Sequence, residues 1–164
     1  MHRHWTISAL GLAAGVALLL GGLIMSWWSY PDGDLVVSIG LREATMCRAG
    51  QGPDPCSMVS LQRLTSIDHL SWLRAGTGAY AAAWMAAILS LSLGGLYAAR
   101  KTSRLLGMTT LVAAASAGTV GLLFVTWVPA DLARGPGLGM VLYFAGVLLA
   151  AVCAVLSQRP VPAA

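Results

Sequence analysis

Four long stretches of this sequence contain no Asp, Glu, Lys, Arg or His, and they constrain the fold more than any other feature. The stretches run from Ile7 to Trp28, from Ala75 to Ala99, from Leu105 to Ala130 and from Gly135 to Gln158. About 20 helical residues cross a hydrocarbon layer of ~30 Å, because each residue adds about 1.5 Å. The sequence therefore predicts one membrane domain, residues 1–164, built on four transmembrane helices.

The overall composition is typical of an integral membrane protein. Apolar residues make up 57% of the sequence and charged residues 10%, and the mean hydropathy is +0.75, whereas soluble domains carry about 25% charged residues. The net charge of +4 comes from basic residues between the apolar stretches, without an aromatic and basic face. We interpret them as loop and interface charges and expect no nucleic-acid partner.

The orientation follows from the ends and the connections of these stretches. The first stretch ends in "SWWSY" rather than in a small-residue cleavage site, so it is interpreted as a retained helix and not as a signal peptide. Four spans place both termini on one side, together with the dense basic turn "RKTSR" from Arg100 to Arg104. Basic loops favour the cytoplasm. We predict an integral plasma (inner) membrane protein with cytoplasmic termini and an extracytoplasmic loop from Ser29 to Arg74.

This long loop shows the alternation of a half-buried β-strand. Leu35, Val37 and Ile39 share one face of "LVVSIGL", and the same period of two continues in "SMVSLQRL" after the cysteines. The Gly/Pro-rich segment "RAGQGPDP" lies between the two runs and is typical of a turn. The sequence predicts a small antiparallel sheet between Leu35 and Leu64.

Cys47 and Cys56 lie nine positions apart around that turn. Cytosolic cysteines two or four apart would favour metal or redox chemistry, whereas an even pair in an oxidising compartment favours a structural disulfide. A bond closing about ten residues contributes roughly 2.5–3 kcal/mol in the chain-entropy model. We predict that the pair forms an extracytoplasmic disulfide that stabilises the sheet.

The four stretches lack the ionisable residues that transporters, pumps and haem proteins carry within the membrane. The histidines, His2, His4 and His69, lie outside them, and we expect no cofactor and no metal. Small residues are frequent instead and allow helices to approach closely; the candidates are Gly11, Gly15, Ala114 and Gly118. We expect them to pack within one bundle, with contact to a partner protein as the alternative. The tryptophans at span ends are interpreted as interface anchors; they are Trp5, Trp27, Trp28, Trp72 and Trp127.

The order of these features resembles the claudin and peripheral-myelin-protein superfamily over nearly the whole chain. The claudin loop signature is a Trp, then Gly-Leu-Trp, then two cysteines. The matching residues here are Trp28 (or Trp27), Gly40, Leu41, Cys47 and Cys56. Arg74 resembles the arginine that precedes the second claudin span, while Arg42 replaces the second signature Trp. The resemblance implies four helices carrying a disulfide-bonded outer sheet, with Trp28, Gly40, Leu41 and Arg74 in structural roles.

Three functions are compatible with this sequence. The first is a non-enzymatic, claudin-like membrane protein that acts through protein–protein interaction, as an adhesion protein, a scaffold or an accessory subunit. Its partners would be the lipid bilayer and other membrane proteins or further copies of itself. The alternative is a channel or carrier for a small or lipidic solute. A thiol oxidoreductase is less favoured, because it would need a C-x-x-C motif and a second exchanging pair. We expect no catalytic residues.

Overall fold

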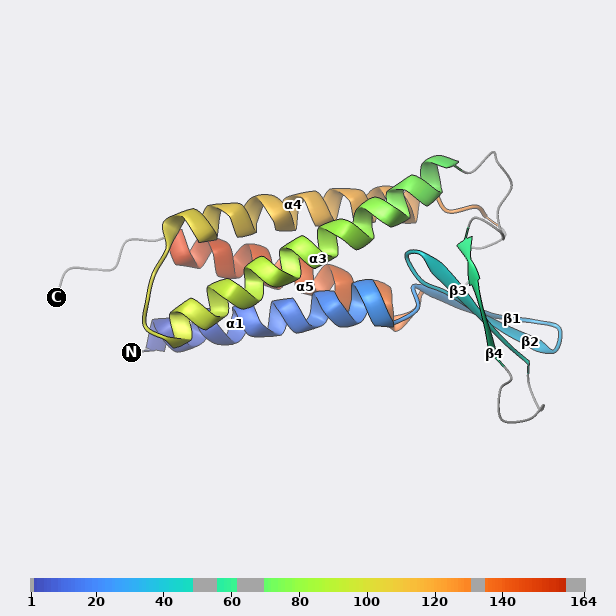
Figure 1. Cartoon of the computed structure of the whole chain (residues 1–164), viewed down its shortest axis with the longest axis horizontal. Helices are drawn as coiled ribbons and strands as arrows, with labels where there is room; N and C mark the ends of the chain where they lie inside the picture. The colour runs from blue at the N-terminus through green and yellow to red at the C-terminus, as the bar shows by residue number, and fades with distance from the viewer. Residues whose placement is uncertain (1, 49–55, 62–69, 131–134, 159–164) are drawn as a thin grey trace.

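The computed structural model describes residues 2–48, 56–61, 70–130 and 135–158. Within these residues, four helices form an elongated bundle and a β-sheet is attached to one end of it (Figure 1). The beginning of α1 and the end of α5 lie at the end away from the sheet (Figure 1). The predicted fold is confirmed at this level, as a helical bundle that carries a small antiparallel sheet.

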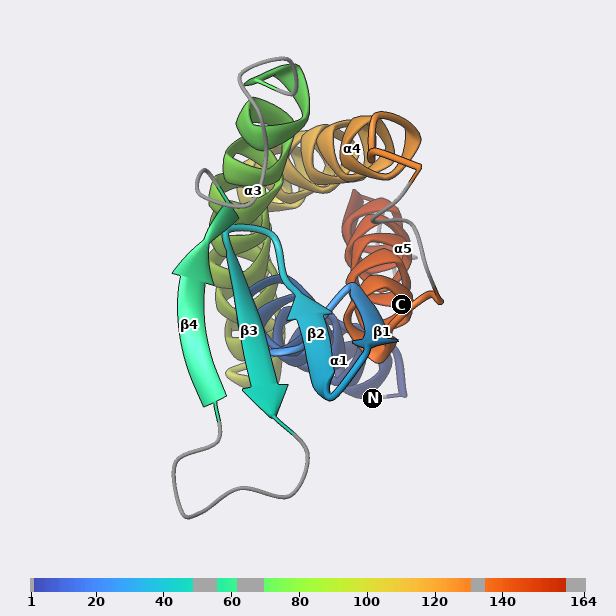
Figure 2. The ribbon, with the colours of Figure 1, turned by 90° about the vertical axis from the view of Figure 1, so that its right-hand side faces the viewer.

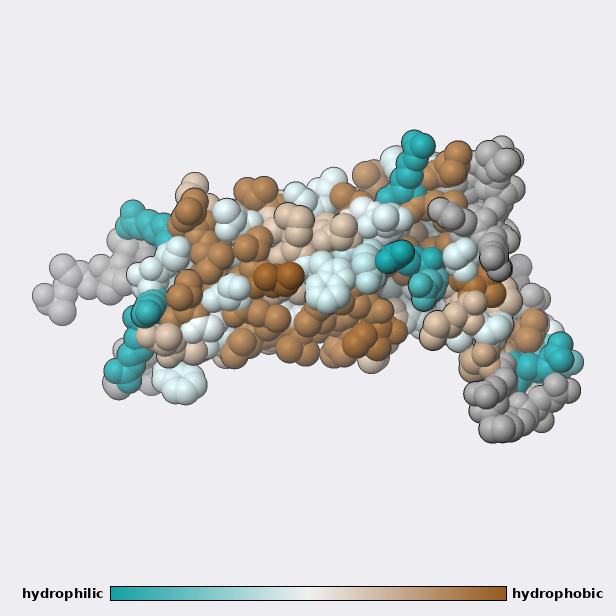
Figure 3. All heavy atoms as spheres, in the orientation of Figure 1, coloured by the Kyte–Doolittle hydropathy of each residue, from teal (hydrophilic) through white to brown (hydrophobic). Residues whose placement is uncertain are grey.

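Each of the four helices is long and apolar enough to cross a membrane. They are α1 (His2–Leu19) with its π-helical continuation η1 (Leu20–Ile24), α3 (Leu70–Ala98), α4 (Arg104–Thr126) and α5 (Leu138–Gln158). Both α1 and α4 pack against α3 and α5, so the helices form a closed ring (Figure 2). An apolar surface covers much of the bundle's length in the view of Figure 3, with hydrophilic residues gathered towards its two ends.

The helix bounds differ from the uncharged stretches at several places. The first helix ends at Ile24 rather than Trp28, and α4 ends at Thr126 rather than Ala130. The helix α3 begins at Leu70, so Arg74 lies inside it and not before it. An uncharged stretch shows which residues are compatible with lipid. A helix, however, ends where its backbone N–H and C=O groups form hydrogen bonds outside the helix. The N–H of Trp27, for example, donates to the carbonyl of Ile39 at 2.7 Å.

The sheet has four antiparallel strands in the order β1-β2-β3-β4. They are β1 (Trp28–Asp32), β2 (Leu35–Ile39), β3 (Glu43–Arg48) and β4 (Cys56–Ser60). Figure 2 looks onto this sheet, with β4 on the side of α3 and β1 on the side of α5. The prediction of a sheet confined to Leu35–Leu64 was therefore wrong for β1. This strand is formed by residues next to the first helix, and a bridge between Trp28 and Pro136 also joins it to the segment just before α5.

Aromatic rings fill the junction between the sheet and the bundle. The ring of Trp27 lies 4.9 Å from that of Tyr143 and 5.3 Å from that of Phe124, and Phe124 stacks on Trp72 at 5.1 Å. Trp28 contacts the same cluster from β1. The rings belong to different helices and to the sheet, so the cluster joins the two parts of the molecule into one core.

Trp27, Trp28 and Trp72 are buried, so their prediction as interface anchors was wrong. The indole N–H of Trp27 donates to the carbonyl of Gly21 at 2.8 Å, and that of Trp72 donates to the carbonyl of Phe124 at 3.0 Å. A buried indole needs such a partner. At a span end, the lipid headgroups or the protein itself can satisfy the N–H, and hydropathy does not distinguish the two.

The small residues singled out in the sequence lie at helix contacts inside the bundle. A Cβ on Gly11 would lie 2.9 Å from backbone atoms of Gly94, and Gly15 also packs against α3. Ala114 of α4 is buried in the core. Gly118 lies opposite a valine side chain of α5 with more room, 3.2 Å from its Cβ position. Within the described residues, these positions therefore face neighbouring helices of the same chain.

Candidate functional site

The two faces of the sheet differ in their surroundings. The register places Trp28, Ile39 and Ala44 side by side across three strands, and these residues are buried against the bundle. The opposite face is called the outer face here. It consists of Ser29, Pro31, Val36, Ser38, Glu43, Thr45, Cys47, Cys56, Met58 and Ser60, which alternate along the strands with the positions of the buried face.

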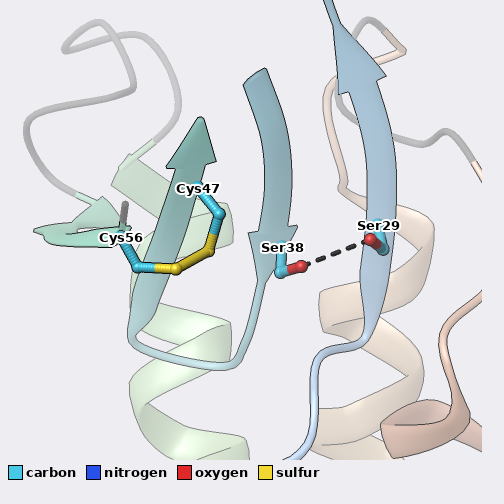
Figure 4. Close-up of a disulfide and its surroundings, with 4 residues drawn as sticks. All are labelled: Ser29, Ser38, Cys47 and Cys56. Atoms are coloured by element: carbon cyan, nitrogen blue, oxygen red, sulfur yellow. Dashed lines mark hydrogen bonds between the residues drawn. A yellow bond between two sulfur atoms is a disulfide. The ribbon is translucent and has the colours of Figure 1, made fainter. Parts of the chain in front are cut away.

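A disulfide joins Cys47 and Cys56 on the outer face (Figure 4). The two residues are opposite each other in the β3–β4 register. Further along the same face, the hydroxyls of Ser29 and Ser38 lie 3.2 Å apart, with either able to donate (Figure 4). The disulfide that the sequence predicted is therefore present between β3 and β4, and it fixes the pairing of these strands. The turn that the sequence placed between the cysteines lies outside the described residues.

The outer face exposes two apolar side chains on either side of the disulfide. Met58 of β4 is 79% exposed and Val36 of β2 is 41% exposed. In the described part of the chain, β4 pairs only with β3, so it is an edge strand of the sheet. An edge strand offers unpaired backbone groups to a partner chain. The outer face therefore combines apolar side chains, a pairing edge and a covalently fixed backbone.

Two neighbouring cavities lie where the turn between β2 and β3 meets the helices. The first, of about 430 Å³, is called the α1-side cavity; the end of η1, the outer-face residues Ser38 and Thr45, and Tyr80 of α3 line it. Arg42 also lines this cavity, and its guanidinium lies 4.9 Å above the Tyr80 ring. This cation–π contact gives the exposed arginine a preferred position.

The second cavity, of about 520 Å³, is called the α3-side cavity and lies between the sheet and the first turns of α3. Arg42 and Glu43 line both cavities, and Arg74 lines only this one. Leu41 is buried at the base of the turn, where the N–H of Gly40 donates to the carbonyl of Glu43 at 2.8 Å. Arg74 is exposed, and among the described residues no hydrogen bond links it to the sheet.

The described residues contain few groups that could bind a metal ion or react as a thiol. No three His, Cys, Asp or Glu side chains among them gather into a metal-binding group. Cys153 is the free cysteine, and its Sγ lies 3.3 Å from the carbonyl of Ile7, buried between α5 and α1. Together with Ile7, Leu93 and Tyr97 it forms a small buried cluster that is separate from the core next to the sheet. This cluster is far in sequence from the Cys47–Cys56 bond.

Sequence reasoning brought out Cys47, Cys56 and Arg74, but it missed Arg42, Tyr80 and Met58 as site residues. The sequence did show Arg42 in the place of a signature Trp, and this was the available signal. The contact of Arg42 with Tyr80 depends on the angle between the sheet and α3, which no local pattern encodes. No protein-family model and no curated protein matches this sequence.

Proposed function

We propose that this chain is a non-enzymatic integral membrane protein of claudin-like architecture that acts through protein–protein interaction. Its role would be that of an adhesion protein, a scaffold or an accessory subunit of a membrane complex. The observation that carries the proposal is the outer face, where Met58 is 79% exposed next to a disulfide and on an edge strand. Methionine is over-used at adaptable binding surfaces, and an edge strand can pair with a strand from a partner.

The membrane placement rests on the four apolar helices and on the apolar surface in Figure 3. We place the protein in the plasma (inner) membrane, with the bundle in the bilayer and the sheet on the extracytoplasmic side. The termini and the basic turn from Arg100 to Arg104 are then cytoplasmic, in agreement with the positive-inside rule. This orientation also places the disulfide in the compartment where such bonds persist.

Cysteine labelling tests this orientation. In intact cells or spheroplasts, a membrane-impermeant maleimide is expected to label Cys47 and Cys56 only after an impermeant reductant has been added. Cys153 is the internal control, because it is buried in α5 and should react only after denaturation. Labelling of the outer pair that requires permeabilised cells would contradict the orientation, and labelling without reductant would contradict a stable disulfide.

Site-specific photo-crosslinking tests the interaction surface. A photoreactive amino acid at Met58 is expected to give a discrete crosslinked product, containing either a second protein or a second copy of the chain. Ser57 is the matched control, because it is the exposed neighbour whose side chain lies on the other face of β4. A further position is Val112, which is 66% exposed on α4 and reports contacts at the helices.

Products at Met58 but not at Ser57 would support the outer face as the binding surface. Products at Val112 alone would move the contact to the helices and contradict the proposed site. If no position gives a protein product and the purified protein moves a solute across vesicle membranes, the channel or carrier alternative replaces this proposal.

A further inference from the structure

The helix α3 is long enough to reach from one headgroup layer of a bilayer to the other. Its 29 residues extend about 43 Å, and a bilayer with its headgroups is about 40–45 Å thick. If the helices span a membrane, as proposed above, Arg74 in the second turn of α3 lies in the headgroup layer on the side of the sheet. Arg100 and Lys101, just beyond the other end of α3, lie in the opposite layer.

Two arginines line the α3-side cavity at this end of the bundle. Arg42 comes from the turn between β2 and β3, and Arg74 comes from α3. Arg42 is held over the ring of Tyr80. Among the described residues, neither arginine is paired with a carboxylate. Two arginines at one cavity that have no carboxylate partner among the described residues favour an anion such as a phosphate, which accepts charge-assisted hydrogen bonds from arginine.

The walls of the same cavity combine apolar with polar and charged side chains, which favours an amphiphile over a free anion. Four leucines line it, together with the two arginines; they are Leu41, Leu61, Leu70 and Leu73. The cavity volume of about 520 Å³ falls within the usual range for small-molecule sites, about 300–1,000 Å³. A molecule with a phosphate next to an apolar portion would match both parts of the lining.

An exposed stripe on α3 continues from this cavity along the bundle. Thr77, Ala81, Trp84 and Ile88 follow Arg74 at spacings of three and four residues, and all are exposed. Residues at these spacings lie on one helix face. An acyl chain that begins at the cavity can therefore lie along this stripe towards the middle of the bilayer.

Glu43 adds a preference for the rest of the headgroup. Its side chain is exposed and it lines both cavities beside Arg42. A headgroup that carries a second negative charge would be repelled by this carboxylate, whereas an ammonium group would be attracted to it. Two arginines and one glutamate therefore match a zwitterion that contains one phosphate and one primary amine.

We propose that Arg42 and Arg74 bind the phosphate of an aminophospholipid in the leaflet on the side of the sheet. Its phosphoethanolamine amine lies towards Glu43, and one acyl chain follows the exposed stripe of α3. The site rests on the proposed membrane placement and does not require a protein partner at Met58, although Arg42, Glu43 and Met58 all line the α1-side cavity. It would fix the sheet relative to the membrane plane, because Arg42 belongs to the sheet and Arg74 to the bundle.

Native mass spectrometry of the full chain in a delipidating detergent tests the site. The purified protein is titrated with phosphatidylethanolamine, phosphatidylglycerol and phosphatidylcholine, and with inorganic phosphate as a competitor. The variants are R42Q/R74Q, Glu43→Gln and R100Q/K101Q. The last variant removes two positive charges at the other end of α3, so it is the control for general attraction between lipids and basic residues. Single Arg74→Gln serves if the double variant fails to fold.

Wild-type protein is expected to bind phosphatidylethanolamine most tightly, and inorganic phosphate is expected not to displace it. R42Q/R74Q should weaken this binding about tenfold or more, because each cation near a lipid phosphate contributes measurably. R100Q/K101Q should leave it nearly unchanged. Glu43→Gln should reduce the preference for phosphatidylethanolamine over phosphatidylglycerol.

Equal binding to wild type and R42Q/R74Q, or equal losses in R42Q/R74Q and R100Q/K101Q, would overturn the site. Displacement by inorganic phosphate would assign the arginines to a soluble anion instead. A preference for phosphatidylglycerol that depends on the arginines would overturn the role of Glu43. None of these results would alter the cysteine labelling or the crosslinks from Met58, so failure of the lipid site and failure of the proposed function can be told apart.

Discussion

Replacing Gly94 with leucine is expected to destabilise the bundle strongly, by about 3 kcal/mol or more. A Cβ at this position would lie 2.9 Å from the backbone nitrogen of Leu12 and 3.0 Å from the carbonyl oxygen of Ser8. These are backbone atoms of α1, so α1 and α3 would have to separate along their contact. Overpacking of this kind usually costs about 1–3 kcal/mol, and more where the neighbours cannot move. Thermal unfolding of the purified protein in detergent measures the effect.

The adjacent Gly95 provides a matched control on the same helix. A Cβ there would meet no heavy atom of another part of the structure within 4 Å, and the residue is exposed. Gly95→Leu should leave the melting temperature unchanged or raise it slightly, because leucine has a higher helix propensity than glycine. Similar losses for Gly94→Leu and Gly95→Leu would show that the α1–α3 contact is looser than described.

Trp27→Ala is expected to have a comparable effect, at the junction of the sheet and the bundle. The side chain is fully buried and contacts the rings of Tyr143 and Phe124. Its removal leaves a large cavity and deprives the carbonyl of Gly21 of a donor. Truncation of a buried Trp to Ala typically costs about 3–5 kcal/mol. Besides lowering the melting temperature, the change should make the Cys47–Cys56 bond easier to reduce, because the sheet loses its support.

Trp84→Ala is the control for this substitution. Trp84 lies in the middle of α3 and is 42% exposed, so its truncation should cost much less in detergent. Should Trp84→Ala prove as destabilising as Trp27→Ala, the aromatic cluster would not be the part of the core that holds the sheet in place.

The number of helices could be predicted from the sequence, because a span of apolar residues reflects a physical requirement of the bilayer. The helix ends could not be predicted in the same way. Trp27 and Trp28 extend the first apolar stretch without interruption, yet their backbone groups pair with Ile39 and with the start of α5. Only the position of residues far along the chain decides that the helix stops before them.

The sheet was predictable where its strands alternate and not elsewhere. The alternation of Leu35, Val37 and Ile39 identified β2, and the alternation in "SMVSLQRL" identified β4, whereas β3 (Glu43–Arg48) was not predicted as a separate strand. By contrast, β1 contains Pro31 in the sequence "WSYPD", which weakens a prediction of strand. Proline is tolerated there because, among the described strands, β1 pairs only with β2.

The candidate sites depend on the same distinction between local and distant information. Two cysteines near one turn are close in space for almost any fold of the loop, so their bond was predictable. The arginines of the α3-side cavity are separated by most of the loop, and their approach depends on how the sheet is set against α3. The exposure of Met58 likewise depends on which face of the sheet packs against the bundle, and the local sequence does not show this.

The link between Trp27 and the start of α5 also has a consequence for how the protein is made. The N–H of Gly137 donates to the carbonyl of Trp27 at 2.6 Å, and the N–H of Gly139 donates to Ser26 at 3.0 Å. A ribosome releases residues 26 and 27 long before it reaches residue 137. The β3–β4 hairpin can acquire its disulfide as soon as the loop has crossed the membrane. The hydrogen bonds from Gly137 and Gly139 to residues 26 and 27, however, can form only after the last helix has been made. Until then, the nascent chain lacks the contacts that hold the start of β1 against α5.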